Sequence, residues 1–317
     1  MGDLSRPYHF YYVNGKPTVT LRFAGEPQHM YYREIGSKLI PVRSVTTILK
    51  IIDKPYLMPW AAKVMGIKLL ETMPKENVGH NPLWYTEPIP WEKFEELVRQ
   101  AKSAHKDIKE AAGDVGDLAH MQLEAAITFA VQNLRGVVRW QDFDFSAGND
   151  KRVESCCWAA FSWMKNHNVR WESTEKKVYS LTYNYAGTLD GLCLADSCDD
   201  PVCCPNKFRD ERSIADWKTS NQLSTSYLYQ TSAYQHAELE ENSGRVDARW
   251  ILRLGKEDGE FEAWYATNFA QDFKAFLAAL SLSEAHYNIE KRMSNEKKER
   301  TIRKKKAKMK KDLLEEL

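Results

Sequence analysis

Two short clusters in the chain combine carboxylates with an ammonium group at β-strand spacing. One is Gly187-Thr188-Leu189-Asp190, and the other is Asp216-Trp217-Lys218. We expect neighbouring strands to bring both carboxylates and the lysine to one end of a sheet. Carboxylate oxygens are the ligands that hard divalent cations prefer, and such cations activate water and stabilise charge on a phosphate. The two clusters therefore predict metal-assisted cleavage of a phosphodiester, with the lysine orienting the water or adding positive charge.

Each aspartate taken alone has a simpler interpretation as a turn or strand-end residue. Their surroundings favour the functional one. Gly187 and Gly191 flank Asp190 and permit close backbone approach within a strand. Asp216 and Lys218 stand two residues apart and so share one face. A charged pair that emerges from an apolar strand is costly without a partner or a function.

His120 is a further candidate ligand. It lies in an apolar helical stretch, where a lone histidine is usually a hydrogen-bonded core residue. However, Gly113 and Gly116 open this stretch, and a glycine-rich helix N-terminus favours anions. Imidazole also binds borderline divalent metals, and Glu124 shares the helical face of His120 at i+4.

The hydropathy pattern indicates which elements position these residues. The opening segment alternates like short strands separated by turns, and a proline-rich loop follows the first helix. Helices, strands and a late hairpin then alternate, which is typical of an α/β protein with one sheet covered by helices. The helices are expected at Trp60–Leu70, Trp91–Ala112, Val115–Leu134, Lys151–Asn166 and Ser224–Glu240, with a last one from Phe269 into the C-terminal tail.

Four motifs in this order resemble the RecB-type nucleases of the PD-(D/E)XK superfamily. They are Gly116–His120, Gly187–Asp190, Asp216–Lys218 and Gln230–Tyr234. In addition, Arg43-Ser44-Val45-Thr46-Thr47-Ile48-Leu49 is similar to the PSVTTIL segment of phage-encoded exonucleases and of the mitochondrial genome maintenance exonuclease, with arginine where that pattern has proline. The motifs are short, and their order and spacing make the match specific.

The resemblance covers roughly residues 40–285 and implies a restriction-endonuclease-like central mixed sheet flanked by helices. The chain's own pattern adds a large helical block and, before the region of resemblance, an N-terminal β-hairpin region. The expected parts are an N-terminal β extension at 1–40, a RecB-like nuclease domain at 41–290 with its helical block at about 50–167 and its catalytic core at about 168–290, and a basic tail at 291–317.

The resemblance also implies roles for individual residues. His120, Asp190, Asp216 and the backbone carbonyl of Trp217 are expected to bind the metal. Lys218 is expected to position the attacking water or to help deprotonate it. The cofactor is expected to be Mg²⁺ or Mn²⁺, as two ions about 3.5–4 Å apart.

Five more residues take roles that the sequence leaves open. Gln230 and Tyr234 are expected either to contact the DNA backbone or to brace the site. Glu175 corresponds to a metal-binding glutamate of many relatives, or is a surface strand residue. Ser44 and Thr46 either contact phosphate or cap the following helix.

The cysteines are the main departure from the resemblance. Six cysteines without regular spacing do not predict a secreted disulfide framework. Four of them, Cys193, Cys198, Cys203 and Cys204, cluster between the two catalytic strands. Four thiolates can bind Zn²⁺, but the spacing lacks paired C-x2-C knuckles, so a loop of free thiols is the other interpretation. For Cys193, which stands in strand-like sequence, a core side chain is a further alternative.

The chain's composition bears on partners and location. Residues 291–317 carry 12 Lys and Arg against five Asp and Glu, a net +7 in a chain of net +1. This tail either contacts a polyanion or is a solvated or disordered end. No run approaches the roughly 18 apolar residues of a membrane span, and the first residues do not resemble a signal or transit peptide. We expect a cytoplasmic protein, in the host cytoplasm if phage-encoded, with no membrane partner.

The sequence thus predicts a metal-dependent DNA exonuclease. Its expected substrate is linear DNA, ends or single strands, in phage-type recombination, replication or repair. The helical block is expected to grip a strand, with exposed Trp or Tyr stacking on bases. A recombinase or single-strand-binding protein is a possible partner. The alternative is a catalytically silent DNA-end-binding or recombination-partner protein on the same fold.

Overall fold

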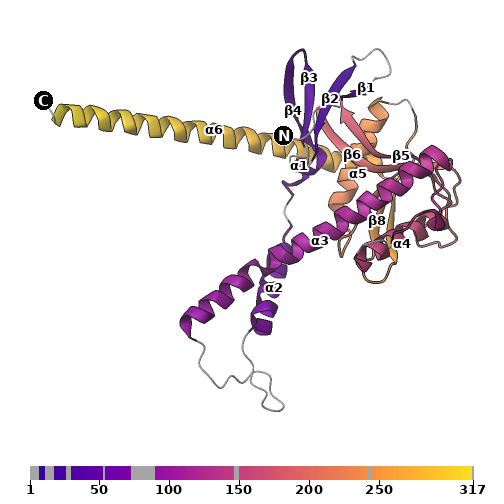
Figure 1. The fold of residues 1–317 in the computed structure, drawn as a ribbon. Coiled ribbons are helices and arrows are strands. Elements are labelled where there is room, and N and C mark those ends of the chain that lie inside the picture. The colour runs from indigo at the N-terminus through magenta and orange to yellow at the C-terminus, as the bar shows by residue number, and fades with distance from the viewer. Residues whose placement is uncertain are drawn as a thin grey trace.

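The computed structural model describes residues 7–10, 18–25, 30–52, 54–72, 90–145, 150–241 and 244–315, with side chains as far as residue 306. Within these residues, nine strands form one mixed sheet (Figure 1). The strands are β1 Pro7–Phe10, β2 Val19–Ala24, β3 Met30–Ile35, β4 Lys38–Ser44, β5 Arg170–Ser180, β6 Tyr185–Ala195, β7 Glu211–Lys218, β8 Ala248–Leu254 and β9 Phe261–Ala266.

Six α-helices and one short 3₁₀ helix accompany this sheet in the described part of the chain. They are α1 Val45–Leu49, α2 Leu57–Thr72, α3 Trp91–Asn133, η1 Trp140–Asp142, α4 Lys151–Asn166, α5 Thr225–Glu241 and α6 Phe269–Glu315. The expected α/β class with a mixed sheet, N-terminal hairpins and flanking helices is therefore confirmed.

Strand β6 is the centre of the sheet, and its two edges differ. One edge pairs with β5 along nearly its whole length. The other edge is divided, because β4 pairs in parallel with Tyr185 and Ala186 whereas β7 pairs antiparallel from Gly191 onward. Among the described residues, no strand pairs with this second edge over 187–190. The Gly187–Asp190 motif therefore lies in a gap between β4 and β7.

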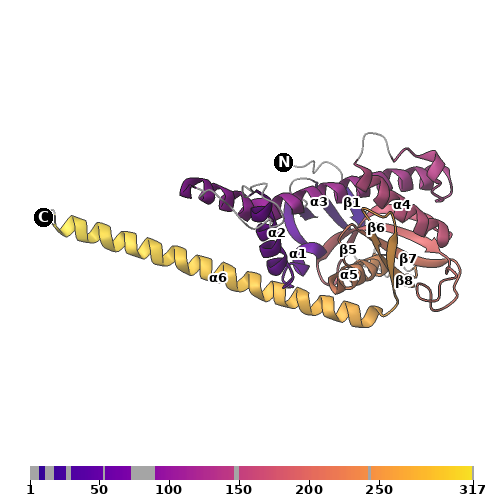
Figure 2. The same cartoon turned by 90° about the horizontal axis from the view of Figure 1, so that it is seen from below.

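Helices cover both faces of the central sheet and bury two apolar clusters. On one face, α3 and α4 pack through Leu123, Ile127 and Trp163 against Trp217 and Trp250. On the other, α1, α5 and α6 bury a second cluster, which includes Ile48, Leu189, Ile214, Ala233 and Phe276. The sheet is thus the middle layer of three, and its strands are held from both sides (Figure 2).

The N-terminal strands extend the sheet as two hairpins. Strands β1 to β4 pair antiparallel in chain order. They close a third cluster in which Leu21, Tyr31 and Val42 pack against Tyr179 and Ala186 of the central strands. The N-terminal segment is therefore part of the same sheet, and its inner surface reaches the gap beside β6.

Helix α3 differs from the sequence prediction. Two helices were expected, Trp91–Ala112 and Val115–Leu134, whereas the structure has one continuous helix of 43 residues. The expected break lay at Gly113. An isolated glycine costs a helix only about 1 kcal/mol, and packing of the apolar stripe on either side outweighs this cost. The uninterrupted helix carries His120 to the sheet while its first half projects away from it with α2 (Figure 1).

Helix α6 starts on the sheet and then leaves the body of the protein. Phe273, Phe276 and Leu280 are buried, but every described side chain from Glu284 to Lys306 is exposed. The basic tail is therefore the continuation of a long helix up to Glu315 (Figure 2). None of the helices in the described ranges is long and apolar enough to cross a membrane.

Candidate metal centre

Three side chains from three elements meet beside residues 187–190 of β6, at the gap between β4 and β7. His120 of α3, Glu175 of β5 and Asp190 of β6 each present a ligand atom, and these atoms lie within 4.8 Å of one another. His120 Nδ1 is 3.8 Å from Asp190 Oδ2. All three side chains are partly exposed. This separation suits donors around a shared cation, which draws its ligands to within 2.0–2.6 Å of itself.

Asp190 occupies the point at which β7 leaves β6. The last residue pair of the two strands is Gly191 with Ala215. Beyond it, the backbone N–H of Trp217 donates to Asp190 Oδ2 at 2.8 Å instead of to a strand carbonyl. This bond fixes the carboxylate through Oδ2, and the residues that the structure describes give Oδ1 no backbone partner. Because β7 separates from β6 here, the Asp190 side chain lies in the gap between β4 and β7, next to His120 and Glu175.

Glu175 has an unusual backbone. Its neighbours Thr174 and Lys176 pair with Gly191 and Leu189, so Glu175 stands opposite Asp190. Its φ is +48°, in the left-handed region that non-glycine residues adopt only at a cost. Burial, followed by the nearby Asp190 charge, raises the pKa of Glu175 to about 7. Like charges that face each other across two strands repel, so this arrangement favours a bound cation.

Asp216 and Lys218 form an ion pair next to this cluster. Asp216 is fully buried, and apart from this ion pair neither carboxylate oxygen has a hydrogen-bond partner among the described residues. Burial raises the pKa of Asp216 to about 6, while Lys218 opposes and Asp190 adds to this effect. Burial lowers the pKa of Lys218, but Asp216 and Asp190 outweigh it and the net pKa is raised.

Asp216 therefore lies beside the three-residue group without belonging to it. The group brings together His120, Asp190 and Glu175, and Glu175 was the least expected of these ligands. The carboxylate of Asp216 is directed to Lys218, which is the strongest partner within reach. The backbone N–H of Trp217 is engaged by Asp190, and the role of its carbonyl stays a prediction.

Gln230 and Tyr234 are placed as a brace. Gln230 Nε2 donates to the Tyr234 hydroxyl at 2.9 Å, one turn along α5. The Tyr234 ring is buried directly over Gly187, where an added Cβ would come within 2.4 Å of Cε1. Glycine in the Gly187–Asp190 motif is thus required by this ring. Of the two roles expected for the pair, bracing is the one that these contacts support.

His120 is held at the site by close contact between α3 and the end of β7. A Cβ at Gly116 would lie 2.7 Å from Thr219 Oγ1, so this glycine lets the helix approach the chain just after Lys218. One turn earlier, Lys256 Nζ donates to the carbonyl of Ala112 at 3.1 Å. The Gly-x-x-x-His spacing therefore has a packing reason.

The segment before α1 has a structural role. Ser44 is the N-cap of α1 and accepts a hydrogen bond from Thr47 N at 3.1 Å, which is one of its two expected roles. Thr46 is exposed, and its contact with phosphate stays a prediction. Arg43, which stands where the similar exonuclease segment has proline, donates to Ser283 Oγ at 2.9 Å and pairs with Glu284 at 2.8 Å. It thus ties β4 to α6.

One charged residue near the candidate metal group, Lys177, was not singled out from the sequence. Lys177 Nζ lies 3.6 Å from Glu175 Oε2 and 4.8 Å above the Phe23 ring. Burial lowers its pKa, although Glu175 and Glu124 counteract this effect. The period-2 spacing of Glu175 and Lys177 on one strand was the signal that could have identified the lysine.

The cysteine cluster differs from the expected set. Cys193 is fully buried inside β6 and does not join the other three. The fourth member is His167, which follows α4, so the group is His167, Cys198, Cys203 and Cys204. Cys193 packs in the apolar cluster between the sheet and α4, so its grouping with the loop cysteines is wrong and the core interpretation of this residue is confirmed.

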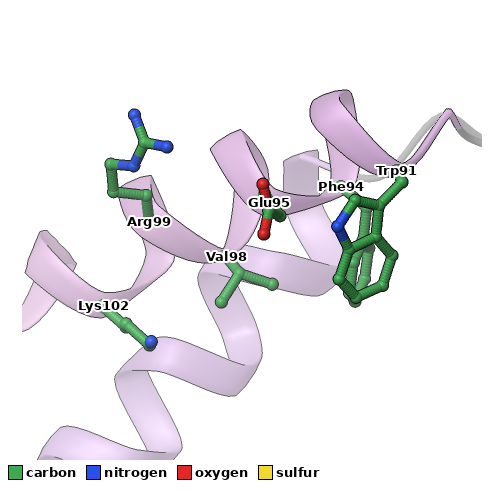
Figure 3. Close-up of a pocket in the computed structure, with 6 residues that line it drawn as sticks. All are labelled: Trp91, Phe94, Glu95, Val98, Arg99 and Lys102. Atoms are coloured by element: carbon green, nitrogen blue, oxygen red, sulfur yellow. The ribbon is translucent and has the colours of Figure 1, made fainter.

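The arm formed by α2 and the first half of α3 carries a separate hollow of about 350 Å³ (Figure 3). Trp91 and Phe94 line it with ring centroids 5.8 Å apart. Arg99 and Lys102 lie further along the same helix. Glu95 also lines the hollow, and Arg99 pairs with Glu96 at 3.0 Å. Trp91 is 66% exposed, so its aromatic face, with Lys102 further along the helix, is available to a ligand.

No protein-family model matches the chain, and no curated protein sequence is significantly similar to it.

Proposed function

We propose that the protein is a Mg²⁺- or Mn²⁺-dependent deoxyribonuclease with a restriction-endonuclease-like fold of the RecB type, which acts as an exonuclease on linear DNA. The observation that carries this proposal is the convergence of His120, Glu175 and Asp190, from a helix and two strands, beside the buried Asp216–Lys218 pair. These groups are far apart in sequence, and packing alone gives no reason to collect three carboxylates in one place.

The donor set fits a hard divalent cation. Three carboxylates and one imidazole supply oxygen and nitrogen ligands, and the facing charges of Glu175 and Asp190 need a counter-charge. Asp216 lies beside the three-residue group, and apart from its ion pair with Lys218 neither of its buried oxygens has a hydrogen-bond partner in the described part of the chain, so the carboxylate can also contact a cation there. His120, Glu175, Asp190 and Asp216 would hold the metal. A bound Mg²⁺ or Mn²⁺ supplies Lewis-acid polarisation of the phosphate and lowers the pKa of water.

The protein's own groups then have separate tasks. Lys218 lies 4.9 Å above the Tyr227 ring and beside Asp216, where its ammonium can orient a water or stabilise charge on the phosphate. The N–H of Trp217 holds Asp190 in place. Tyr234 and Gln230 support the strand that carries Asp190, so they position the site without contacting DNA.

Two surfaces suit a DNA strand on its way to this site. The aromatic and cationic hollow around Trp91 offers base stacking and phosphate contacts (Figure 3). The exposed basic part of α6 offers phosphate contacts alone. Action on phage-type recombination, replication or repair intermediates, with a recombinase or a single-strand-binding protein as partner, belongs to the same proposal.

The test is digestion of end-labelled linear and circular DNA with Mn²⁺, with and without chelator. We expect linear DNA to be degraded and closed circles to survive. Asp190→Asn and Asp216→Asn should each lower the rate by roughly 100-fold or more while DNA binding is retained, because each would hold the metal and even residues that only support a metal ligand contribute about 10- to 100-fold. Glu257→Gln, an exposed carboxylate in the turn after β8, is the matched control and should keep full activity.

Each other outcome has a definite meaning. Cleavage of circles at the rate of linear DNA would show an endonuclease. Binding without cleavage by the wild-type protein would favour the catalytically silent DNA-end-binding protein. Undiminished cleavage by both asparagine variants would reject this site.

A further inference from the structure

The group His167, Cys198, Cys203 and Cys204 lies apart from the candidate metal centre. The three cysteines stand in the connection between Ala195, the end of β6, and Glu211, the start of β7, and His167 caps α4. The four ligand atoms lie within 4.8 Å of one another. Three sulfurs and one ring nitrogen converge from two segments that are far apart in the sequence.

We propose that His167, Cys198, Cys203 and Cys204 form a structural Zn²⁺ site that fastens the β6–β7 connection to the end of α4. This inference is independent of the nuclease activity, because none of its residues contributes to the centre at Asp190.

The distances match one tetrahedral ion. With Zn–S bonds of about 2.3 Å and Zn–N bonds of about 2.0 Å, two sulfurs around zinc are about 3.8 Å apart, and a sulfur and a nitrogen about 3.6 Å. In the protein, Cys198 Sγ and Cys204 Sγ are 3.4 Å apart, and His167 Nε2 is 3.6 Å from Sγ of both Cys203 and Cys204. The set is Cys₃His, a composition typical of closed structural sites.

The orientation of His167 supports a ligand role. Its Nδ1 lies 2.9 Å from the carbonyl oxygen of Trp163. A carbonyl can only accept, so Nδ1 carries the proton and donates it. Nε2 is then the atom with the free lone pair, and it is the atom that faces the sulfurs. Histidine ligands of metals are usually fixed in this way by a partner of the other ring nitrogen.

The surroundings of the group hold the His167 ring in place on one side and leave a path for an ion on the other. The His167 ring packs against Trp163 and Trp250, with centroids 5.4 and 4.8 Å away. The backbone N–H of Cys198 donates to Cys204 Sγ at 3.3 Å, as suits a sulfur that carries negative charge. A surface hollow of about 340 Å³, lined in part by Cys198, Cys203 and Phe261, adjoins the group and leaves a path for an ion.

The adjacency of Cys203 and Cys204 does not prevent shared binding here. Both Sγ atoms lie at the same distance from His167 Nε2. The turn that contains them brings this about, because Cys204 N donates to the carbonyl of Asp200 at 2.8 Å. The alternative state of these residues is a Cys198–Cys204 disulfide, so the experiment must distinguish a disulfide from metal binding.

The first test uses the full-length, tag-free wild-type protein, purified with reductant and dialysed against metal-free buffer without chelator. Elemental analysis should find about one zinc per chain. Alkylation with iodoacetamide, read by peptide mass spectrometry, should spare Cys198 and Cys203 until EDTA and denaturant are added. Both are only partly buried, so they should be modified readily without zinc. Absence of zinc together with ready alkylation, or a Cys198–Cys204 disulfide in reduced preparations, would overturn the proposal.

The second test compares variants. His167→Ala and Cys203→Ser should each weaken Zn²⁺ affinity by roughly 100-fold or more, since even supporting residues of a zinc ligand contribute 10- to 100-fold. Cys193→Ala, a buried cysteine of the adjoining strand, is the matched control and should keep a full equivalent of zinc. Co²⁺ added to the metal-free wild-type protein should give the visible absorption of a tetrahedral thiolate complex. Zinc loss in the control to the same extent as in Cys203→Ser would contradict the assignment.

Discussion

The Glu175–Asp190 pair concentrates negative charge at the gap in the sheet. The two residues face each other across β5 and β6, and the left-handed backbone of Glu175 adds local strain. Lys177 at 3.6 Å relieves part of the repulsion, yet the pKa of Glu175 remains raised. Carboxylates that bind a metal commonly destabilise the folded protein through their mutual repulsion without a cation, and they become favourable once they coordinate one.

A first prediction concerns the pH dependence of the protein in chelator. Because the pKa of Glu175 is raised to about 7 from an ordinary 4.5, the folded state holds this proton more tightly than the unfolded state. The contribution of Glu175 to stability is therefore full below about pH 4.5 and is lost as the pH rises through 7. Glu175→Gln should remove this loss and raise stability at pH 8 by up to about 1 kcal/mol.

Urea unfolding of both proteins in EDTA from pH 5 to 8 measures this effect. Mn²⁺ should stabilise the wild type more than the variant, because the variant lacks one ligand. A stability difference that does not change with pH would show that the charge of Glu175 is unimportant for folding.

A second prediction concerns the Asp216–Lys218 pair. Asp216 is fully buried, so removing its cationic partner leaves an uncompensated charge, which costs about 3 kcal/mol. Lys218→Met should therefore destabilise the chelated protein at pH 8 by about that amount in urea unfolding. The double variant Asp216→Asn/Lys218→Met should recover most of the loss. A single and a double variant of equal stability would mean that Lys218 contributes through packing instead of charge.

At the scale of elements, Gly187, Gly116 and Gly113 differ in how closely neighbouring elements pack against them. Gly187 lies beneath the Tyr234 ring, and Gly116 contacts Thr219, whereas an added Cβ at Gly113 would meet nothing within 4 Å. The close approaches are thus where α5 contacts β6 and where α3 contacts the chain just after β7. The exposed Gly113 is a helix residue without such a contact.

Alanine substitutions should separate these cases. Gly187→Ala should destabilise by about 1–3 kcal/mol, because the buried ring has to move to accommodate the methyl group, and it should also lower nuclease activity by displacing the brace. Gly113→Ala should stabilise by about 0.5–1 kcal/mol through helix propensity. Chemical unfolding measures both values, and equal effects at the two positions would refute the packing argument.

The same contacts explain what the sequence could and could not predict. Asp190 stands in a largely apolar strand, and Asp216 and Lys218 follow Ile214 and Ala215 at a spacing of two, so their location in the sheet could be predicted from the sequence. The grouping of Glu175 with Asp190 depends on strand register and on the left-handed residue, which no local pattern specifies. His167 joins cysteines about 30 positions downstream, and only the packing of α4 against the sheet reveals that pairing.

At the scale of the whole molecule, α6 begins on the acidic body of the protein and continues as a basic extension. Its 47 residues correspond to about 70 Å of helix, and most of that length projects from the sheet (Figure 1). The segment 291–317 holds a net +7. A helix that is exposed on all sides gains no stability from packing, so its charge is the property that matters.

The last prediction is that this extension contributes phosphate contacts. Deleting residues 291–317 should leave thermal unfolding of the body unchanged but weaken DNA binding, measured in chelator to prevent cleavage. If the helix makes about four phosphate contacts, the slope of log K against log salt should become less steep by roughly 3–4. The triple variant Lys304→Glu/Lys305→Glu/Lys306→Glu keeps the helix and reverses exposed charges, so it should reproduce most of the loss. If binding and its salt dependence were the same in all three proteins, DNA would have to be held by the body alone, with the arm around Trp91 as the next surface to mutate.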